Sequence, residues 1–447
     1  MNKYENSVGV FVPHMLLPNK NVDLTRWAVV ACDQYTSQPE YWEETERIVG
    51  DAPSTLRLML PEMYLGKPDE AERITKINAT MDKYVLDGTL EDKGEGFVLT
   101  RRSVAGNVRT GIVMALDLEC YDYNKGATTL IRATEGTIVE RIPPRLRIRE
   151  NAPLEMPHIL VLIDDPEKTV IEPTLAKYAS KEKLYDFELM QKGGHIEGWF
   201  VGCENEIKRI IRALEKLADK DAYKAKYGKE HPMLFAMGDG NHSFATAKAN
   251  WENVKKTLTP EQMKDHPARF ALIELENVHD DGIVFEPIHR VLFNLDTDKA
   301  IAYLMDKLAH DNGSCEMKQF KSKAERDDAM ADDAEQGAHM LPFCLKGSYG
   351  YFKVKKPSAQ LEVGTLQNAL DAMLKELKGA VIDYIHGEDV VYDLGTQDGN
   401  MGFLLPPMDK GAFFRTVIFD GALPRKTFSM GEANEKRYYL ECKSIKK

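Results

Sequence analysis

A short polar turn between two apolar segments constrains this sequence more than any other feature. Pro232 introduces the apolar run 233–237, which predicts a buried strand, and residues 244–254 predict an alanine-rich helix. Between these segments lies the hexapeptide Gly238-Asp239-Gly240-Asn241-His242-Ser243. A strand, a glycine turn and a helix start together present free backbone N–H groups at the positive end of a helix dipole. We therefore expect this turn to bind an anion such as a phosphate group.

The glycines and the small polar residues of the turn have separate predicted tasks. Gly238 and Gly240 can take positive φ and let a ligand approach the backbone closely. Asn241 or Ser243 can cap the helix with a side-chain oxygen. These properties favour a sharp entry into a helix whose start faces a ligand.

Asp239 and His242 distinguish this turn from an ordinary helix entry. A carboxylate and an imidazole three residues apart can serve as metal ligand or general base and as proton donor or phosphate contact. The simpler alternative is that Asp239 caps the turn and His242 is a surface histidine. Both interpretations remain open from the residues alone.

Size and charge limit the possible partners. The chain has 447 residues, more than a single core usually serves, so we expect two domains. Hydrophobic residues make up 43%, yet no apolar stretch approaches the roughly 20 residues of a membrane span. A net charge of −12 disfavours binding to nucleic acid. A small-molecule partner is therefore expected, and neither a membrane nor a polyanion.

The start of the chain and the cysteines predict a cytoplasmic location. Residues 1–12 lack the long apolar core and small-residue cleavage site of a signal peptide. The six cysteines are spread singly and form no C-x-x-C pair, so we expect reduced thiols rather than zinc or redox chemistry.

Strand and helix patterns are mixed along the chain and predict an α+β fold rather than a doubly wound sheet. Strand-like runs lie at residues 27–31, 97–104, 108–116, 158–163, 233–237 and 270–275. Helical periodicity is clearest at residues 74–85 and 207–217. We divide the chain into a core of residues 1–295 and a C-terminal α+β subdomain of residues 296–447. The subdomain is expected to hold helices near 301–308 and 366–377 and strands at 339–345, 349–354, 402–405 and 413–419.

A row of arginines precedes the middle of the core. Arg141, Arg145, Arg147 and Arg149 share one face if this segment is a strand. Such a row can bind phosphate or nucleic acid, but the net negative charge of the chain favours internal salt bridges.

Several familiar sites lose support. The sequence has no H-E-x-x-H, G-x-S-x-G, G-x-x-x-x-G-K-[ST] or G-x-G-x-x-G pattern in a suitable strand and helix setting. Gly193-Gly194-His195 separates two strand-like runs and predicts a hairpin turn, with His195 as a loop histidine and not a metal ligand.

An ordered set of segments resembles the domain of unknown function 1015 family. Residues 239–247 resemble its Asp-Gly-His-His-Arg-Tyr-Glu-Thr-Ala signature. Four further matches follow the family's order: residues 31–41 with Asp33 and Tyr35, residues 135–137 followed by Arg145, the Pro-x-His-Arg box at 286–290, and the Lys-Thr box at 423–428. The resemblance spans nearly the whole chain, and the ordered set is more specific than any single box.

The family signature is similar to the Gly-x-x-His-Arg turn of ParB-like proteins, sulfiredoxins and free serine kinases. The resemblance implies a mixed-sheet ParB/sulfiredoxin-like core in which the turn grips nucleotide phosphates. It further implies a nucleotide-dependent phosphotransferase that uses ATP or ADP with Mg²⁺, and a free amino acid such as serine as candidate acceptor.

One position departs from the family pattern. His242 is followed by Ser243 where the family usually has arginine, so a guanidinium that would clamp phosphates is missing. Arg290, Arg145 or Lys426 could replace it in space. Alternatively, this branch has changed its substrate.

The resemblance assigns roles to individual residues. The amides of Gly240, Asn241 and Ser243 would hold phosphate, together with Gly238. Asp239 would bind metal or orient the acceptor, and His242 would contact the transferred phosphoryl group.

The expected base and the other phosphate contacts lie elsewhere in the chain. Glu135 is the candidate general base, and Asp33 is its rival. Arg290 would bind phosphate or a substrate carboxylate, and Lys426 is placed in the site by its box alone.

Two other kinds of function stay open. The chain could be a non-catalytic protein that senses a nucleotide or phosphate and binds a protein partner, since fold analogy does not exclude this. A nuclease or phosphohydrolase is the third possibility. A base close to the turn favours the enzyme, and a continuous basic groove beside His242 favours the nuclease.

Overall fold

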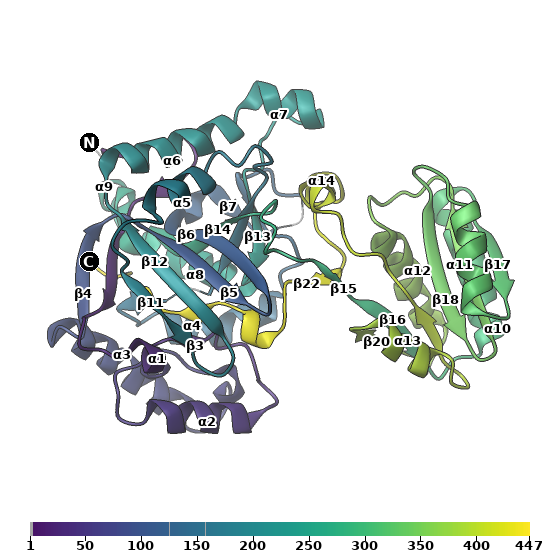
Figure 1. Cartoon of the computed structure of the whole chain (residues 1–447), viewed down its shortest axis with the longest axis horizontal. Helices are drawn as coiled ribbons and strands as arrows, with labels where there is room; N and C mark the ends of the chain where they lie inside the picture. Colours follow the sequence, from purple (N-terminus) through teal and green to yellow (C-terminus); the bar gives the residue numbers. More distant parts are fainter. Residues whose placement is uncertain (1–2, 125, 157) are drawn as a thin grey trace. The chain divides into compact units, whose positions relative to one another are not determined.

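The protein, described here from a computed structural model, forms two compact units (Figure 1). The structure describes residues 3–124, 126–156 and 158–447. The first unit comprises Met1–Val284 and Met430–Lys447, and the second comprises Phe285–Ser429. The division falls ahead of the expected boundary at residue 296, because strand β16 (His289–Phe293) pairs with β20 (Val381–Ile385) inside the second unit.

A long mixed sheet runs through the first unit and confirms the predicted α+β class. In spatial order its strands are β11 (Tyr185–Leu189), β12 (Gly194–Val201), β5 (Phe97–Val104), β6 (Asn107–Asp117), β14 (Phe270–Asn277), β10 (Leu160–Ile163), β13 (Phe235–Asp239), β8 (Ile131–Arg132) and β7 (Tyr121–Asp122), with β1 (Val10–Phe11) beside β6. From β11 to β14 the neighbours are antiparallel, whereas β10 runs parallel to β14 and β8 runs parallel to β13 and β7. The predicted hairpin at residues 193–195 joins β11 to β12 and is confirmed.

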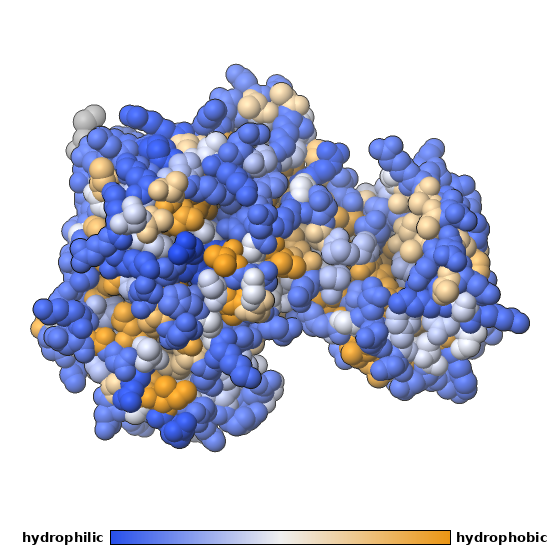
Figure 2. Space-filling view, in the orientation of Figure 1, coloured by the Kyte–Doolittle hydropathy of each residue, from blue (hydrophilic) through white to orange (hydrophobic). Residues whose placement is uncertain are grey.

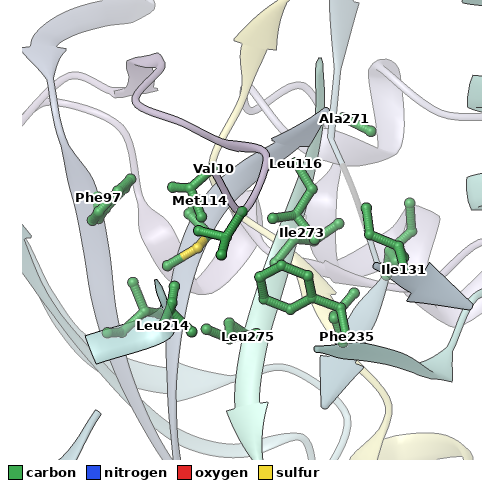
Figure 3. Close-up of a cluster of buried hydrophobic side chains, with 14 of the residues drawn as sticks. Val10, Phe97, Met114, Leu116, Ile131, Leu214, Phe235, Ala271, Ile273 and Leu275 are labelled. Atoms are coloured by element: carbon green, nitrogen blue, oxygen red, sulfur yellow. The ribbon is translucent and has the colours of Figure 1, made fainter. Parts of the chain in front are cut away.

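Helices cover both faces of this sheet. They are α1 (Leu24–Trp27), α2 (Pro39–Val49), α3 (Glu70–Leu86), α4 (Ile142–Arg149), α5 (Glu172–Tyr178), α6 (Glu204–Leu217), α7 (Lys220–Tyr227), α8 (Asn241–Val254) and α9 (Pro260–Lys264). Because side chains of a strand alternate between faces, Ile273 and Leu275 of β14 join one hydrophobic cluster and Leu272 joins another. The first cluster, drawn in Figure 3 with Leu214 and Phe235, also takes residues from α5, α6 and α8, while the second takes them from α1, α2 and α3.

The chain returns to the first unit after the second. Three short antiparallel pairs lie in this unit: β2 (His14–Pro18) with β4 (Leu90–Glu95), β3 (Val29–Val30) with β23 (Tyr438–Tyr439), and β9 (Leu154–Glu155) with β24 (Lys443–Ser444). Two of them use the segment Met430–Lys447, and the indole of Trp27 donates a hydrogen bond to the Leu440 carbonyl at 3.1 Å. This segment is therefore an integral part of the first unit.

The second unit is built on an antiparallel sheet. Its strands in spatial order are β17 (Glu316–Phe320), β19 (Ser348–Val354), β18 (His339–Leu345), β21 (Met401–Phe403), β16 and β20. Its helices are α10 (Thr297–Asn312), α11 (Lys323–Asp332), α12 (Glu362–Glu376), α13 (Glu388–Gly395) and α14 (Lys410–Asp420). A separate pair joins β15 (Glu286–Pro287) to β22 (Phe428–Ser429).

One predicted strand is a helix, and this prediction was wrong. Residues 413–419 lie in α14, where Asp409 accepts a hydrogen bond from the Ala412 N–H at 3.2 Å and left-handed Gly421 ends the helix. Three arginines of the row lie in the helix α4, whose prolines stand in the first turn, where proline is tolerated, and Arg141 ends the 3-10 turn before it. There Arg145 pairs with Glu62, Arg147 with Glu70, and Arg149 with Glu155, so the expected internal salt bridges are present.

The surface is largely polar. The face seen in Figure 2 is mostly hydrophilic, and the large apolar side chains that stay exposed are spread over several elements: Val85, Leu86, Val108, Ile138, Val139, Val284, Val381, Val390 and Phe419. Within the described ranges, every helix is too short or too polar to cross a lipid bilayer.

A buried ionic centre fixes the returning segment to the sheet. Arg437 is 4% exposed, and its guanidinium lies 2.7 Å from a carboxylate oxygen of Glu274 and 2.7 Å from one of Glu441. Tyr185 donates a hydrogen bond to Glu441 at 2.6 Å. Arg102 donates hydrogen bonds to the main-chain carbonyls of residues 434–436. Charges and carbonyls of the segment thus meet matching groups on β5, β11 and β14.

One carboxyl group of this centre is poorly matched. Glu276 is fully buried, and neither of its oxygens accepts a hydrogen bond from the part of the chain that the structure describes. Burial raises the pKa of Glu276 to about 7, although Arg109 opposes the shift from 3.2 Å away. Burial also acts on Glu274, but Arg437 and Arg109 outweigh it and lower the pKa of that carboxyl. The pKa values of the two acids are therefore shifted in opposite directions, upward for Glu276 and downward for Glu274.

Glu276→Gln should make the fold more stable than the natural protein at pH 8, and this advantage should fade near pH 5. A carboxyl whose pKa is raised in the folded state contributes stability below its ordinary value of 4.5 and loses that contribution as the pH rises through about 7. The pKa shift corresponds to a change of roughly 3 kcal/mol in the free energy of unfolding between low pH and pH 8. Urea unfolding at both pH values measures it. Glu274→Gln is the control and should instead lose stability at neutral pH; identical pH profiles for the two variants would contradict the assignment.

Candidate functional site

The predicted turn has the expected backbone. Strand β13 ends at Asp239, Gly240 follows with a left-handed φ of 79°, and α8 begins at Asn241. A Cβ on Gly240 would lie 3.1 Å from the Cα of Ile159, so both the conformation and the space favour glycine here. Gly238 does not have positive φ but lies in the strand, where a Cβ would come within 3.0 Å of Leu162. Gly240 therefore shapes the turn, and Gly238 permits close packing.

No side chain of the described residues caps the start of α8, so the prediction that Asn241 or Ser243 caps it was wrong. Asn241 turns toward Thr134, accepting a hydrogen bond from its N–H at 3.2 Å and donating to its hydroxyl at 3.3 Å. The Ser243 hydroxyl lies 3.0 Å from Nε2 of His158. The main-chain amides of the first turn are therefore left for another acceptor, at the positive end of the helix dipole.

Lys436 supplies a positive charge at this turn. Its Nζ lies 3.2 Å from Oδ2 of Asp239, whose Oδ1 accepts a hydrogen bond from the Gly240 N–H at 2.8 Å. Sequence analysis missed this residue, because a single lysine in a polar stretch shows nothing of the segment that returns to the turn.

A chain of polar groups joins Asp33 to the helix start. Oδ2 of Asp33 lies 3.9 Å from Nε2 of His158, the same nitrogen that contacts Ser243. Nδ1 of His158 lies 2.7 Å from the hydroxyl of Tyr439, which accepts the Cys32 N–H at 3.2 Å. In one arrangement of the protons the Tyr439 hydroxyl donates to Nδ1, and the imidazole proton then lies on Nε2, toward Ser243 and Asp33. The Ser243 hydroxyl can then donate its own proton to a bound anion.

The charges around Asp33 keep its carboxyl ionised. Burial opposes ionisation, but the electrostatic interaction with His158, the hydrogen bond from Gln34 and the charge of Lys436 outweigh it and lower the pKa of Asp33. An ionised, partly buried carboxylate with these neighbours can accept a proton from a substrate hydroxyl.

His242 is half-buried and accepts a hydrogen bond at Nε2 from the Ile138 N–H at 3.3 Å. Burial lowers its pKa, and the charges of Arg141 and Arg145 lower it further, while Asp33 opposes them. The ring is therefore neutral at pH 7 and carries its proton on Nδ1. The positive field that disfavours imidazolium favours an anion at the same place.

The remaining predicted residues stand in different surroundings. Glu135 is exposed, in the loop between β8 and α4, next to Thr134 that holds Asn241. Arg290 belongs to the second unit, where it is fully buried and donates hydrogen bonds to Gln367 at 3.1 Å and to the main-chain carbonyls of residues 288 and 425. Lys426 is also in the second unit, exposed and with a positive φ of 54°. The first unit therefore brings together Asp33, Asp239, His242 and Ser243.

The residues at the turn do not fit a resident Mg²⁺ ion. Magnesium needs several oxygen ligands in octahedral geometry. Asp239 offers one carboxylate, and its two oxygens already contact the Gly240 amide and the Lys436 ammonium. The role of Asp239 as a metal ligand stays a prediction.

A second histidine and carboxylate group lies on the hairpin of β11 and β12. Potential ligand atoms of Asp186, His195 and Glu197 all lie within 4.8 Å of one another. Lys183 and Arg101 already pair with these carboxylates, and His195, which lies in β12 and not in the loop, contacts Asp186 at 2.7 Å. The group is a balanced ion-pair network on the sheet.

The chain matches the sequence model described as "Protein of unknown function (DUF1015)" over residues 16–373. It belongs to this family. No curated protein matches it.

Solved structures similar to this DUF1015 member share little sequence with it. Free serine kinase in complex with AMP has 10% identity and a TM-score of 0.37, with 74% of this chain and 92% of that chain covered. A conserved hypothetical protein from Pyrococcus furiosus has 11% identity and a TM-score of 0.34, covering 73% and 90%. SbnI with C-terminal truncation from Staphylococcus aureus has 10% identity and a TM-score of 0.32, covering 71% and 83%.

Lys436→Gln should weaken the binding of pyrophosphate at the turn by about tenfold, because a charge-assisted contact of about 1.5 kcal/mol is lost and Asp239 is left unbalanced. Isothermal titration calorimetry measures the dissociation constant. Lys208→Gln, which removes a surface lysine of α6 paired with Glu204, is the matched control and should bind as the natural protein does. Equal affinity for the Lys436 variant and the control would show that the anion does not bind beside Lys436.

Proposed function

We propose that this protein is an enzyme that transfers a phosphoryl group from a nucleotide, ATP or ADP, to a hydroxyl group of a small metabolite. The observation that carries the proposal is the juxtaposition of an uncapped helix start with the ionised carboxylate of Asp33. The helix start holds phosphate, and the Asp33 carboxylate can activate a hydroxyl group. A binding module needs only the first.

Phosphate binding is assigned to the first turn of α8. The amides of Asn241, His242 and Ser243 donate hydrogen bonds to phosphate oxygens, and the Ser243 hydroxyl adds another donor. Lys436 balances charge beside them, in the absence of the signature arginine. His242, neutral and protonated on Nδ1, donates this proton as a hydrogen bond to the transferred group.

The proton of the acceptor passes to a carboxylate. As the acceptor oxygen forms its bond to phosphorus, the bond from phosphorus to the leaving nucleotide oxygen breaks, and the hydroxyl proton moves to Asp33. Asp33 is favoured as the base over Glu135, because His158 links it to Ser243 whereas Glu135 lies on an exposed loop. A free amino acid such as serine is the candidate acceptor implied by the family signature.

The environment proposed for this reaction is the cytoplasm, where nucleotides are available. The six cysteines, all within the described residues, are unpaired, in keeping with a reducing compartment.

A non-catalytic role in nucleotide sensing is the second candidate. It is favoured by Ser243 in the place of arginine, since the guanidinium that would clamp a transferred phosphate is missing. The nuclease alternative is disfavoured, because Arg145, Arg147 and Arg149 are all paired with carboxylates and form no free basic row.

Asp33→Asn should abolish phosphoryl transfer yet keep nucleotide binding, because it removes the base and leaves the turn unchanged. His242→Ala should abolish transfer as well, with the fold intact. Transfer is followed by ³¹P NMR with ATP or ADP and a panel of amino-acid and hydroxy-metabolite acceptors, and binding by the nucleotide-dependent rise in melting temperature.

Glu135→Gln is the matched carboxylate control and should retain turnover. Full turnover in a folded Asp33→Asn protein would overturn the assignment of the base. A natural protein that binds nucleotide but transfers nothing to any acceptor would support the sensing role.

A further inference from the structure

A small cavity begins where the phosphate turn ends. Its volume is about 150 Å³, and its wall includes Ser243 and Thr246 from the first turns of α8. The rest of the wall comes from α3, α4, β9, β23 and the segment 58–65 of the first unit, with five residues from the connections between elements: Cys32, Ala152, Met156, His158 and Ile159. A group bound in this cavity would therefore lie within one side chain's length of an anion held by the amides of α8.

The polar groups in the wall are already engaged with one another. Ser243 and Tyr439 contact His158, Thr246 donates to the His242 carbonyl, Arg145 pairs with Glu62, and Arg149 pairs with Glu155. The exception is Nε of Arg149, which has no hydrogen-bond partner among the described residues. The two arginines of the wall are thus each paired with a carboxylate of the wall. A charged group of a ligand would find no ion-pair partner there, and its desolvation would cost much free energy.

The rest of the wall is apolar. It is formed by carbon and sulfur atoms of Leu58, Leu60, Met81, Ile148, Leu154 and Ile159, among others. An apolar cavity of about 150 Å³ can bind benzene, so the space matches one aromatic ring or a branched alkyl group. A purine with its attached ribose is larger and needs partners for its polar edge, which this wall does not offer.

We propose that this cavity binds the apolar side group of the phosphoryl acceptor, a branched alkyl chain or a single aromatic ring. The inference rests on the proposed function and narrows its acceptor class from any small hydroxyl compound to one with such a group, which replaces serine as the candidate acceptor. The hydroxyl group would lie at Asp33, because His158 in the cavity wall stands between that carboxylate and Ser243. The cavity thereby selects the acceptor, while the turn of α8 holds the nucleotide.

The test begins with benzyl alcohol as probe and the full chain. Binding is measured by ligand-observed NMR, with ethylene glycol as the polar comparison. Ala152 lies in the wall and is buried, so Ala152→Leu should fill part of the cavity and weaken benzyl alcohol binding at least tenfold. Met81→Ala should enlarge the cavity and admit 2-naphthalenemethanol, which the natural protein should reject. Both variants should keep the rise in melting temperature caused by nucleotide.

The outcomes separate this inference from the proposed function. Loss of benzyl alcohol binding in Ala152→Leu with nucleotide binding retained, and a gain for the naphthyl probe in Met81→Ala, support the cavity as the acceptor site. Phosphoryl transfer to serine that proceeds equally well in the natural protein and in Ala152→Leu overturns it while the proposed function stands. Displacement of benzyl alcohol by adenosine also overturns it, because the nucleobase is then the occupant. Failure of every nucleotide to bind the natural protein, with benzyl alcohol still bound, instead removes the proposed function.

Discussion

The buried guanidinium of Arg437 is the interaction on which the candidate site depends. It is held between Glu274 of the central strand β14 and Glu441 further along its own segment. Because this segment is fixed there, Lys436 reaches Asp239 and Tyr439 reaches His158. The pairing of β23 with β3 also places the residues after β3, including Asp33, beside the start of α8. The buried ion pairs of Arg437 thus determine that Lys436 lies at the turn.

Buried ion pairs of this kind fix the position of the segment more than they add to the stability of the fold. Burying an ion pair carries a large desolvation cost, and removing a single partner typically costs about 3–5 kcal/mol because the other charge is left uncompensated. The network around Arg437 contains one acid, Glu276, whose ionisation is disfavoured by the same burial. The segment is therefore held in one register, since any other register would leave charges unpaired in the core.

Elements that follow from a local sequence pattern could be predicted. Contacts made when the C-terminal segment comes back to the first unit could not. The strand, glycine turn and helix around Gly240 follow from apolar runs and turn residues next to one another. The segment of α14 was misassigned because its clustered aromatic residues are typical of a strand, while the cap at Asp409 and the left-handed Gly421 favour a helix. Nothing near Lys436 in the sequence indicates its partner Asp239, because the two meet only through the tertiary fold.

The order of the units along the chain has a consequence for biosynthesis. The second unit is inserted between two parts of the first, so the ribosome makes Phe285–Ser429 before the segment that carries Lys436 and Arg437. Until that segment emerges, Glu274 has no Arg437 and the turn has no lysine. The nascent first unit therefore lacks one positive charge in its core and one at its turn, and its anion site gains Lys436 only after the inserted unit has been translated.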